Sequence, residues 1–186
     1  MEKKIINGLI INDGVVVGVV NPPFIKEAVI PNGVVSINDW AFYHCTSLES
    51  VTIPDSVTSV GKGAFWGCKG LTNINIPDSI TSIGDWAFAY CKSLTSIDIP
   101  DSVTSIGKGV FGLTGLTSVS IPNTVTSIGE WAFSGCTGLT SINIPDSVTS
   151  IGESAFYGCT DLTSVSIPNT VTSMGNNVFW GCINLK

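Results

Sequence analysis

The chain has 186 residues, of which 44% are hydrophobic and only 12% charged, so it can bury a large core and lacks the composition of a disordered protein. Eight Lys, no Arg and 14 acidic residues give a net charge of −6, and without Arg or a Lys cluster we expect no nucleic-acid partner. Polar residues interrupt every long apolar stretch, so we expect no insertion into a membrane.

Residues 1–24 are predicted to form an N-terminal cap and a connector. Two aliphatic runs flank Asp13–Gly14, a pair typical of two-residue hairpin turns, and this predicts a β-hairpin over residues 5–20. The stretch Asn-Pro-Pro-Phe at 21–24 joins the hairpin to the rest of the chain. This segment has no uninterrupted apolar run and no small-residue cleavage site, so it is not predicted to be a signal peptide.

From residue 25 onward one motif is repeated seven times. Its Ile-Pro pair recurs at steps of 23 residues, with a single step of 22, at Pro31, Pro54, Pro77, Pro100, Pro122, Pro145 and Pro168. A fixed period between 20 and 29 residues is typical of a leucine-rich-repeat solenoid. We therefore assign residues 25–186 to a solenoid with the units 25–47, 48–70, 71–93, 94–115, 116–138, 139–161 and 162–184.

The consensus of one unit, counted as slots 1 to 23, is L-T-S-I-x-I-P-[DN]-[ST]-V-T-S-I-G-x-x-A-F-x-G-C-x-x. Alternating β-branched residues predict a short strand at its start, and Pro ends that strand because it cannot donate a ladder hydrogen bond. V-T-S-I predicts a second extended piece, and the Gly after it permits a tight or positive-φ corner. Ala, Phe and Cys then have the spacing of one helical or 3-10 turn. The predicted fold is an α/β repeat solenoid, a right-handed superhelix of seven coils with short parallel strands and short helical turns.

The pattern I-P-[DN]-[ST]-V-T-S-I-G-x-x-A-F-x-x-C resembles the BspA-like leucine-rich repeats of bacterial surface proteins, over residues 25–184. The resemblance implies an adhesin-like module that binds a protein or a glycan, at the cell surface or after secretion. Members of this family usually carry an export signal and more repeats. Because this chain shows no signal peptide, a cytoplasmic location stays open.

Six Cys follow the repeat period, at Cys45, Cys68, Cys91, Cys136, Cys159 and Cys182. Equivalent positions on stacked coils point the same way, and two groups of three cannot pair internally without a leftover. We interpret them as a buried ladder of small apolar groups, with a disulfide or metal site as the alternative. In the shortened unit we expect Leu113 to occupy the Cys slot.

Residues for catalysis are scarce. The run GKGVFG, from Gly107 to Gly112, matches a dinucleotide fingerprint, but a 22-residue coil cannot hold the crossover helix that such a site needs. His44 is the only His, and the Ser residues lie at repeated ladder positions. We expect no enzyme activity, no cofactor and no bound metal.

The variable slots 16 and 19 lie three residues apart, on one face of the predicted helical turn. This face, called here the aromatic stripe, carries Trp40, Tyr43, Trp66, Trp86, Trp131, Tyr157 and Trp180. Exposed aromatic residues are enriched at binding hot spots, so the stripe is the candidate contact surface. The alternative is that the rings lie flat and seal the seams between coils, and both roles can coexist.

Two other features bear on function. Thr-Ser pairs recur on the second extended piece, which predicts a hydroxyl ladder or, alternatively, a flat Thr array of the kind that ice-binding solenoids use. The chain stops at G-C-I-N-L-K without a polar capping segment, which predicts an exposed apolar edge. Either the chain is a fragment of a longer protein, or its last coil packs on a partner, for example by self-association. The rival to a binding function is a structural spacer, whose uniform surface binds nothing.

Overall fold

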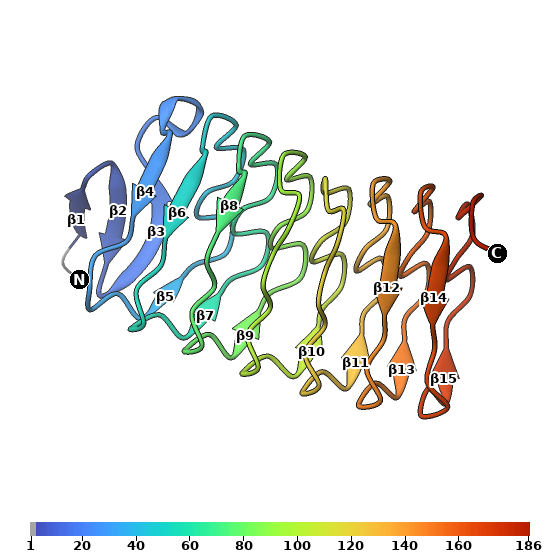
Figure 1. Ribbon diagram of the computed structural model, residues 1–186. Helices are drawn as coiled ribbons and strands as arrows, with labels where there is room; N and C mark the ends of the chain where they lie inside the picture. The colour runs from blue at the N-terminus through green and yellow to red at the C-terminus, as the bar shows by residue number, and fades with distance from the viewer. Residues whose placement is uncertain (1–2) are drawn as a thin grey trace.

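The computed structural model describes residues 3–186 as one elongated stack of coils, with the two ends of the chain at opposite ends of the stack (Figure 1). The first three strands form an antiparallel meander: β1 (Lys3–Ile6), β2 (Leu9–Asn12) and β3 (Val15–Val19). The turns between them, Asn7–Gly8 and Asp13–Gly14, have positive φ at both residues, from 47° to 81°. This is the geometry of the primed turns that suit hairpins. The predicted hairpin is present as β2–β3, and β1 extends it.

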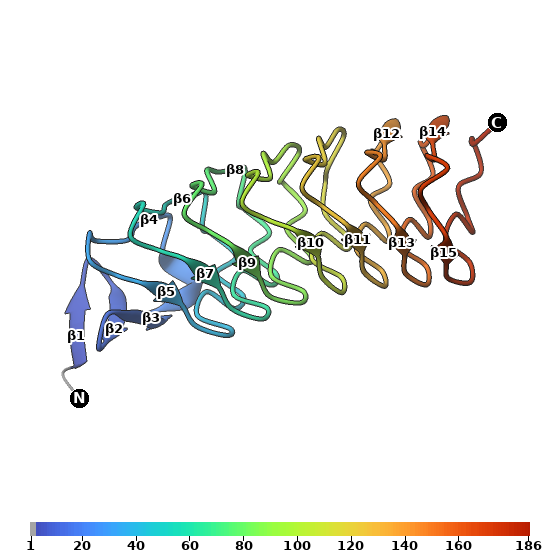
Figure 2. The ribbon, with the colours of Figure 1, turned by 90° about the horizontal axis from the view of Figure 1, so that it is seen from below.

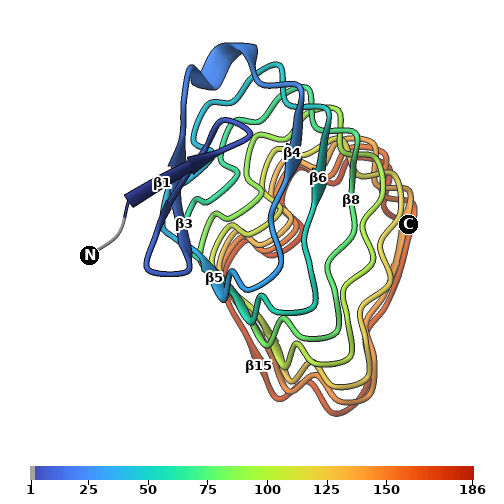
Figure 3. The ribbon, with the colours of Figure 1, turned by 90° about the vertical axis from the view of Figure 1, so that its left-hand side faces the viewer.

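The meander is continuous with the solenoid. Strand β3 pairs in parallel with the first solenoid strand of its row, β5 (Ser36–Ile37), so that Val16 faces Ile37 across the ladder. Leu9 and Val16 are fully buried, whereas every residue of β1 is exposed. Figure 3, a view along the stack, shows β1 lying across its N-terminal end. A 3-10 turn, η1 (Pro22–Phe24), then carries the chain into the first coil.

Two rows of short parallel strands run along the stack. The first row lies at the start of the units and contains β4 (Glu27–Val29), β6 (Ser50–Thr52), β8 (Asn73–Ile74), β12 (Ser141–Asn143) and β14 (Ser164–Ser166). The second row continues from β5 with β7 (Ser59–Val60), β9 (Ser82–Ile83), β10 (Ser105–Ile106), β11 (Ser127–Ile128), β13 (Ser150–Ile151) and β15 (Ser173–Met174). Figure 2 shows this second row following one edge of the stack from β5 to β15. The pairing register equals the repeat, so each residue lies beside its own copy in the next coil.

The third edge of each coil is not helical, and the predicted α/β class is wrong: the fold is a β-solenoid. In the segment expected to be a helical turn, alternate amides bond within the coil and to the next coil. Tyr43 N donates to Trp40 O, while Phe42 N donates to Ala64 O of the following coil at 2.7 Å. The segment forms a third ladder, called here the turn ladder.

Left-handed backbone explains why no helix forms on this edge. Slots 16 and 20 have positive φ in every coil, for example Trp40 at 60° and His44 at 56°. A left-handed residue at every fourth position ends each turn before a helix can propagate. The segment is therefore a series of tight turns that is held in place by its neighbouring coils.

The corner glycines at slot 14 allow neighbouring coils to approach closely. Of the two predicted reasons for Gly here, a tight corner or a positive φ, the positive φ was wrong. Gly61, Gly84 and Gly152 are absent from the positive-φ residues of the described chain. A Cβ atom on Gly84 would instead lie 2.5 Å from the backbone nitrogen of Lys62 in the preceding coil. A side chain on Gly84 would push these two coils apart.

The core is a column of stacked rings beside a column of thiols. Six Phe residues are buried, and successive rings lie 4.9–5.8 Å apart and nearly parallel along the series Phe42, Phe65, Phe88, Phe111, Phe133 and Phe156. The six Cys are free and buried, which confirms the core ladder over a disulfide. The five thiols after Cys45 each donate to a Phe carbonyl of the preceding coil, as Cys68 Sγ does to Phe42 O at 3.1 Å. The slot therefore holds a small apolar group that is also a weak donor.

The shortened unit differs from its predicted alignment. Thr114, 4% exposed, occupies the Cys slot and donates its hydroxyl to Phe111 O at 2.8 Å. Leu113 is 41% exposed, with φ at 59°, in slot 20. The expectation that Leu113 fills the Cys slot was wrong, because the missing residue falls after that slot and not before it. The slot selects a small donor rather than any hydrophobe.

The seam before the shortened unit is looser than the others. The second row divides there into two sheets, between β9 and β10. Ile83 is only half-buried, although its equivalents Val60 and Ile106 are almost completely buried. The Phe88–Phe111 step, at 5.8 Å, is the longest in the ring column. Coil spacing is therefore not uniform along the stack.

Candidate functional site

The seven predicted residues of the aromatic stripe all lie on the turn ladder. Five of them are exposed by between 39% and 65% of their surface: Trp40, Tyr43, Trp131, Tyr157 and Trp180. Trp66 and Trp86 are half-buried. The turn geometry, and not a helix, places these side chains on one edge of the stack.

Some Trp rings of the stripe cover the seam to the next coil. A Cβ atom on Gly63 would collide with the ring of Trp40, and one on Gly109 would collide with the ring of Trp86. Each ring thus lies over the small residue that fills slot 16 of the following coil. This contact explains why Trp and Gly alternate in that slot. Sealing a seam and exposing an outer ring face occur together in Trp40.

At the N-terminal end the rings pack on one another. Tyr43 and Trp66 are stacked with centroids 5.2 Å apart and an interplanar angle of 20°, and Trp66 contacts Tyr90 at 4.8 Å. Trp40 packs edge-on against Tyr43 with ring centroids 5.5 Å apart, and the ring centroids of His44 and Tyr43 lie 4.4 Å apart. We call these five residues the ring cluster. Part of the apolar surface of these rings is therefore covered by the other rings of the cluster.

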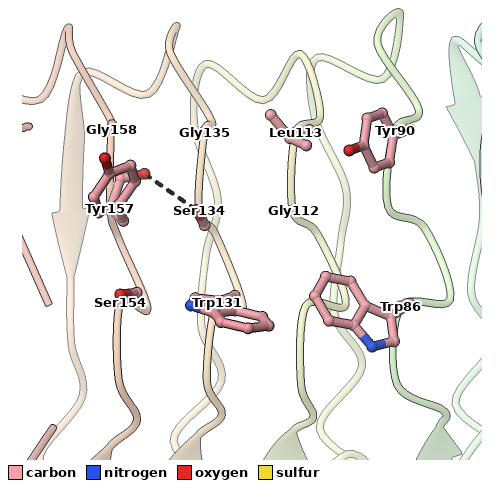
Figure 4. Close-up of a pocket in the computed structure, with 10 residues that line it drawn as sticks. All are labelled: Trp86, Tyr90, Gly112, Leu113, Trp131, Ser134, Gly135, Ser154, Tyr157 and Gly158. Carbon is pink, nitrogen blue, oxygen red and sulfur yellow. Dashed lines mark hydrogen bonds between the residues drawn. The ribbon is translucent and has the colours of Figure 1, made fainter. Parts of the chain in front are cut away.

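Beyond Tyr90 the row of rings breaks off, and a groove opens. Slot 19 holds the small residues Ala89, Gly112 and Ser134 in three successive coils, before Tyr157 restores a ring. The groove has a volume of about 450 Å³ and is shown in Figure 4. It is lined by Trp86, Tyr90, Gly112, Leu113, Trp131, Ser134, Gly135, Ser154, Tyr157 and Gly158.

No charged side chain lines the groove. Lys108 and Glu130 lie beside it and pair with each other at 2.6 Å, and Lys108 Nζ also lies 4.8 Å from the centre of the Trp131 ring. The hydrogen bond to Glu130 raises the pKa of Lys108, so the ammonium stays charged. The polar groups of the lining residues are hydroxyls, the indole N–H groups of Trp86 and Trp131, and backbone. One contact between them joins Ser134 Oγ to Tyr157 O at 3.4 Å.

Sequence reasoning identified only three of the ten residues that line this groove. Trp86, Trp131 and Tyr157 were predicted, whereas Tyr90 and Leu113 were not. Tyr90 stands at a slot that is usually Gly, which is a detectable signal for a ring with a special role. Leu113 was assigned to the core because the gap in the shortened unit was placed too early.

Two structural findings concern other kinds of site. Within residues 3–186, no cluster of three His, Cys, Asp or Glu side chains is arranged to hold a metal ion. The described part of the chain contains no helix with the length and hydropathy needed to cross a bilayer.

Comparisons with known proteins agree with this architecture. The chain is similar to the leucine-rich repeat protein of T. pallidum, with 34% identity and a TM-score of 0.83 over 100% of this chain and 87% of that one. It is also similar to a leucine-rich repeat protein from Eubacterium ventriosum, with 26% identity and a TM-score of 0.80 over 93% of this chain and 47% of that one. No curated protein was found to match.

The family model described as BspA type leucine rich repeat region matches residues 21–140 and 109–186. Together these ranges span nearly the whole chain, including the coils that build the groove. The chain belongs to the BspA-type leucine-rich repeat family.

Proposed function

We propose that this chain is a non-enzymatic binding module that presents its turn ladder to a protein or glycan partner. The observation that carries the proposal is the exposed aromatic stripe, interrupted by an uncharged groove. Large aromatic side chains beside a concave surface are typical of binding sites. We also propose action at the cell surface or after secretion, as the family resemblance implies, which antibody labelling of intact cells tests.

The two strand rows are weaker candidates for the contact surface. Their Thr hydroxyls are used within the stack: Thr126 Oγ1 donates to Thr104 O, and Thr149 Oγ1 to Thr126 O, both at 3.3 Å. This repeated bond supports the simple hydroxyl ladder over an ice-binding array. The uniformity of these faces is also the observation that favours a structural spacer, the second candidate function.

A pull-down with extracellular matrix proteins and a glycan panel distinguishes the two candidates. We expect the native chain to capture a partner, and the variant Trp86→Ala/Trp131→Ala/Trp180→Ala to lose at least about tenfold in affinity, the loss typical of a hot-spot ring. A matched control, Thr58→Ala/Thr104→Ala/Thr149→Ala, alters the second strand row and should bind like the native chain. Circular dichroism must show that both variants are folded. If the native chain and both variants all failed to bind a partner, the structural spacer would be favoured.

The last coil is proposed as a surface for self-association. Ile167 and Met174 are exposed by 39% and 47%, although the equivalent Ile144 and Ile151 of the preceding coil are only 3% and 2% exposed. We expect sedimentation to show a dimer at high concentration. Met174→Lys should shift it towards monomer, because it places a charge in the apolar contact. A native chain that remains monomeric at all concentrations would contradict this proposal.

A further inference from the structure

We propose that the groove binds a neutral oligosaccharide, with a sugar ring lying where the row of aromatic rings breaks off. The inference rests on the proposed binding function and names the class of ligand for that surface. Four observations support it: the gap in the ring row, the apolar wall with its few hydroxyls, the use of the backbone donors along the groove, and the absence of lining charge.

The gap has the dimensions of a missing row of flat rings. In the ring cluster, slot 19 of two successive coils is filled by Tyr43 and Trp66, which stack at 5.2 Å. In the groove, the same slot is occupied by the small residues Gly112 and Ser134, and an open space lies over them. Adjacent coils are about 4.8 Å apart, so the three steps from Tyr90 to Tyr157 span roughly 14 Å. A short oligosaccharide fits this length better than a single ring does.

The walls of the groove suit the two faces of a sugar. The ring centroids of Trp86 and Trp131 lie 5.7 Å apart, with an interplanar angle of 46°, and together the two rings form an apolar wall. One face of a pyranose carries C–H groups that pack on such rings, while its edges carry hydroxyls. A small number of placed polar groups among apolar ones is the usual composition of a specific pocket. Here the hydroxyls of Tyr90, Ser134 and Tyr157 supply these polar groups.

An extended peptide is disfavoured, because the main chain along the groove has already used its donors. The amides of Leu113, Gly135 and Gly158 donate to carbonyls of the following coils, at 2.7, 2.7 and 2.8 Å. Binding of a peptide as an added strand depends on free main-chain donors and acceptors at an edge. What remains available in the groove are ring faces, side-chain hydroxyls and indole N–H groups, which match a carbohydrate.

The ligand should be uncharged. None of the lining residues is Lys, Asp, Glu or His, and the nearest charged pair, Lys108 and Glu130, is internally neutralised at 2.6 Å. The net charge of −6 further opposes an acidic sugar. The geometry therefore selects a neutral glycan over a uronate or a sialylated chain.

The test is calorimetric titration of the whole chain with neutral hexasaccharides: β-1,4-glucan, β-1,4-mannan, α-1,4-glucan and β-1,4-N-acetylglucosamine. A galacturonate hexamer serves as the acidic comparison. The decisive variant is Ser134→Tyr, which fills the gap with the side chain that slot 19 already holds at Tyr157, so the fold tolerates it. We expect at least one neutral hexamer to bind the native chain. Affinity should fall tenfold or more in Ser134→Tyr and in Trp131→Ala, and the matched exchange Tyr43→Ser, outside the groove, should leave it unchanged.

Several outcomes would overturn the inference. They are binding of none of the neutral hexamers, a preference for the galacturonate hexamer, or equal binding by native chain and Ser134→Tyr. If a protein from the pull-down loses affinity in Ser134→Tyr while no hexamer binds, the glycan class is wrong but the binding module stands. If nothing binds in either experiment, the proposed function fails as well.

Discussion

Raising the pH from about 9 to about 11 is expected to lower the free energy of unfolding by roughly 4 kcal/mol through two buried thiols. Burial raises the pKa of Cys91 to about 12 and that of Cys136 to about 11, from an ordinary value of 9.0. Below the unfolded-state pKa both states are protonated, and the stabilisation is complete. Above it, the unfolded chain releases protons that the folded chain keeps, so each thiol costs about 1.4 kcal/mol per pH unit.

Urea unfolding between pH 8 and 11, in the presence of a reductant, measures this effect. The control is Cys91→Thr/Cys136→Thr, which uses the residue that Thr114 shows to fit the same slot. Between pH 9 and 11 its free energy of unfolding should fall less steeply than that of the native chain, by about 2 kcal/mol per pH unit, since Lys and Tyr are common to both proteins. Equal slopes would mean that the thiols titrate alike in the folded and unfolded states, and the buried column would not be a source of alkaline lability.

Most of the fold could be predicted from the sequence repeat. A step of 23 residues fixes the strand register, because Ser59 pairs with Ser82 and Ser127 with Ser150 at that spacing. Alternating β-branched residues locate the strands, and Asp13–Gly14 locates the hairpin. These signals are local or periodic, so they are visible without knowledge of any contact.

The turn ladder was not predictable from spacing alone. Ala, Phe and Cys at slots 17, 18 and 21 suit a helical turn, but they equally suit two successive tight turns. The information that decides is the left-handed φ at slots 16 and 20, which the sequence shows only as occasional Gly, such as Gly63 and Gly67. Trp40 and His44 adopt the same φ, because ladder bonds to the next coil hold them there.

The sequence predicted on which edge of the stack the aromatic side chains lie, but it did not predict the groove between them. The slot pattern placed Trp86 and Trp131 on one face, and this depends only on the repeat. Whether a ring covers a seam depends on the neighbouring coil, as with Trp86 over Gly109. The groove arises where slot 19 holds small residues in successive coils, at Ala89, Gly112 and Ser134. It also depends on the gap in the shortened unit, whose position the sequence left ambiguous.

The substitution Gly152→Ala is expected to destabilise the protein by about 3 kcal/mol, whereas Gly107→Ala at the same slot should cost about 1 kcal/mol or less. Neither residue has a positive φ, so backbone strain contributes to neither result. At Gly152 the new Cβ would lie 2.6 Å from the carbonyl carbon of Gly129, which belongs to the preceding coil and cannot move alone. At Gly107 the nearest atom is a carboxylate oxygen of Asp85 at 2.8 Å, which a side-chain rotation can remove.

Thermal and urea unfolding of the two variants, with the native chain alongside, measure the difference. The remaining cost at Gly107 comes from Asp85, since its Oδ1 accepts a 2.9 Å bond from Lys108 N that rotation would break. The variant Asp85→Ala/Gly107→Ala should therefore be no less stable than Asp85→Ala. If the two glycine variants lost the same stability, coil separation could not be the reason for Gly at this slot. A large difference would show that the coils are farther apart at the seam between β9 and β10 than at the seam between β11 and β13. It would also show that close spacing of the coils, rather than corner geometry, requires Gly at slot 14.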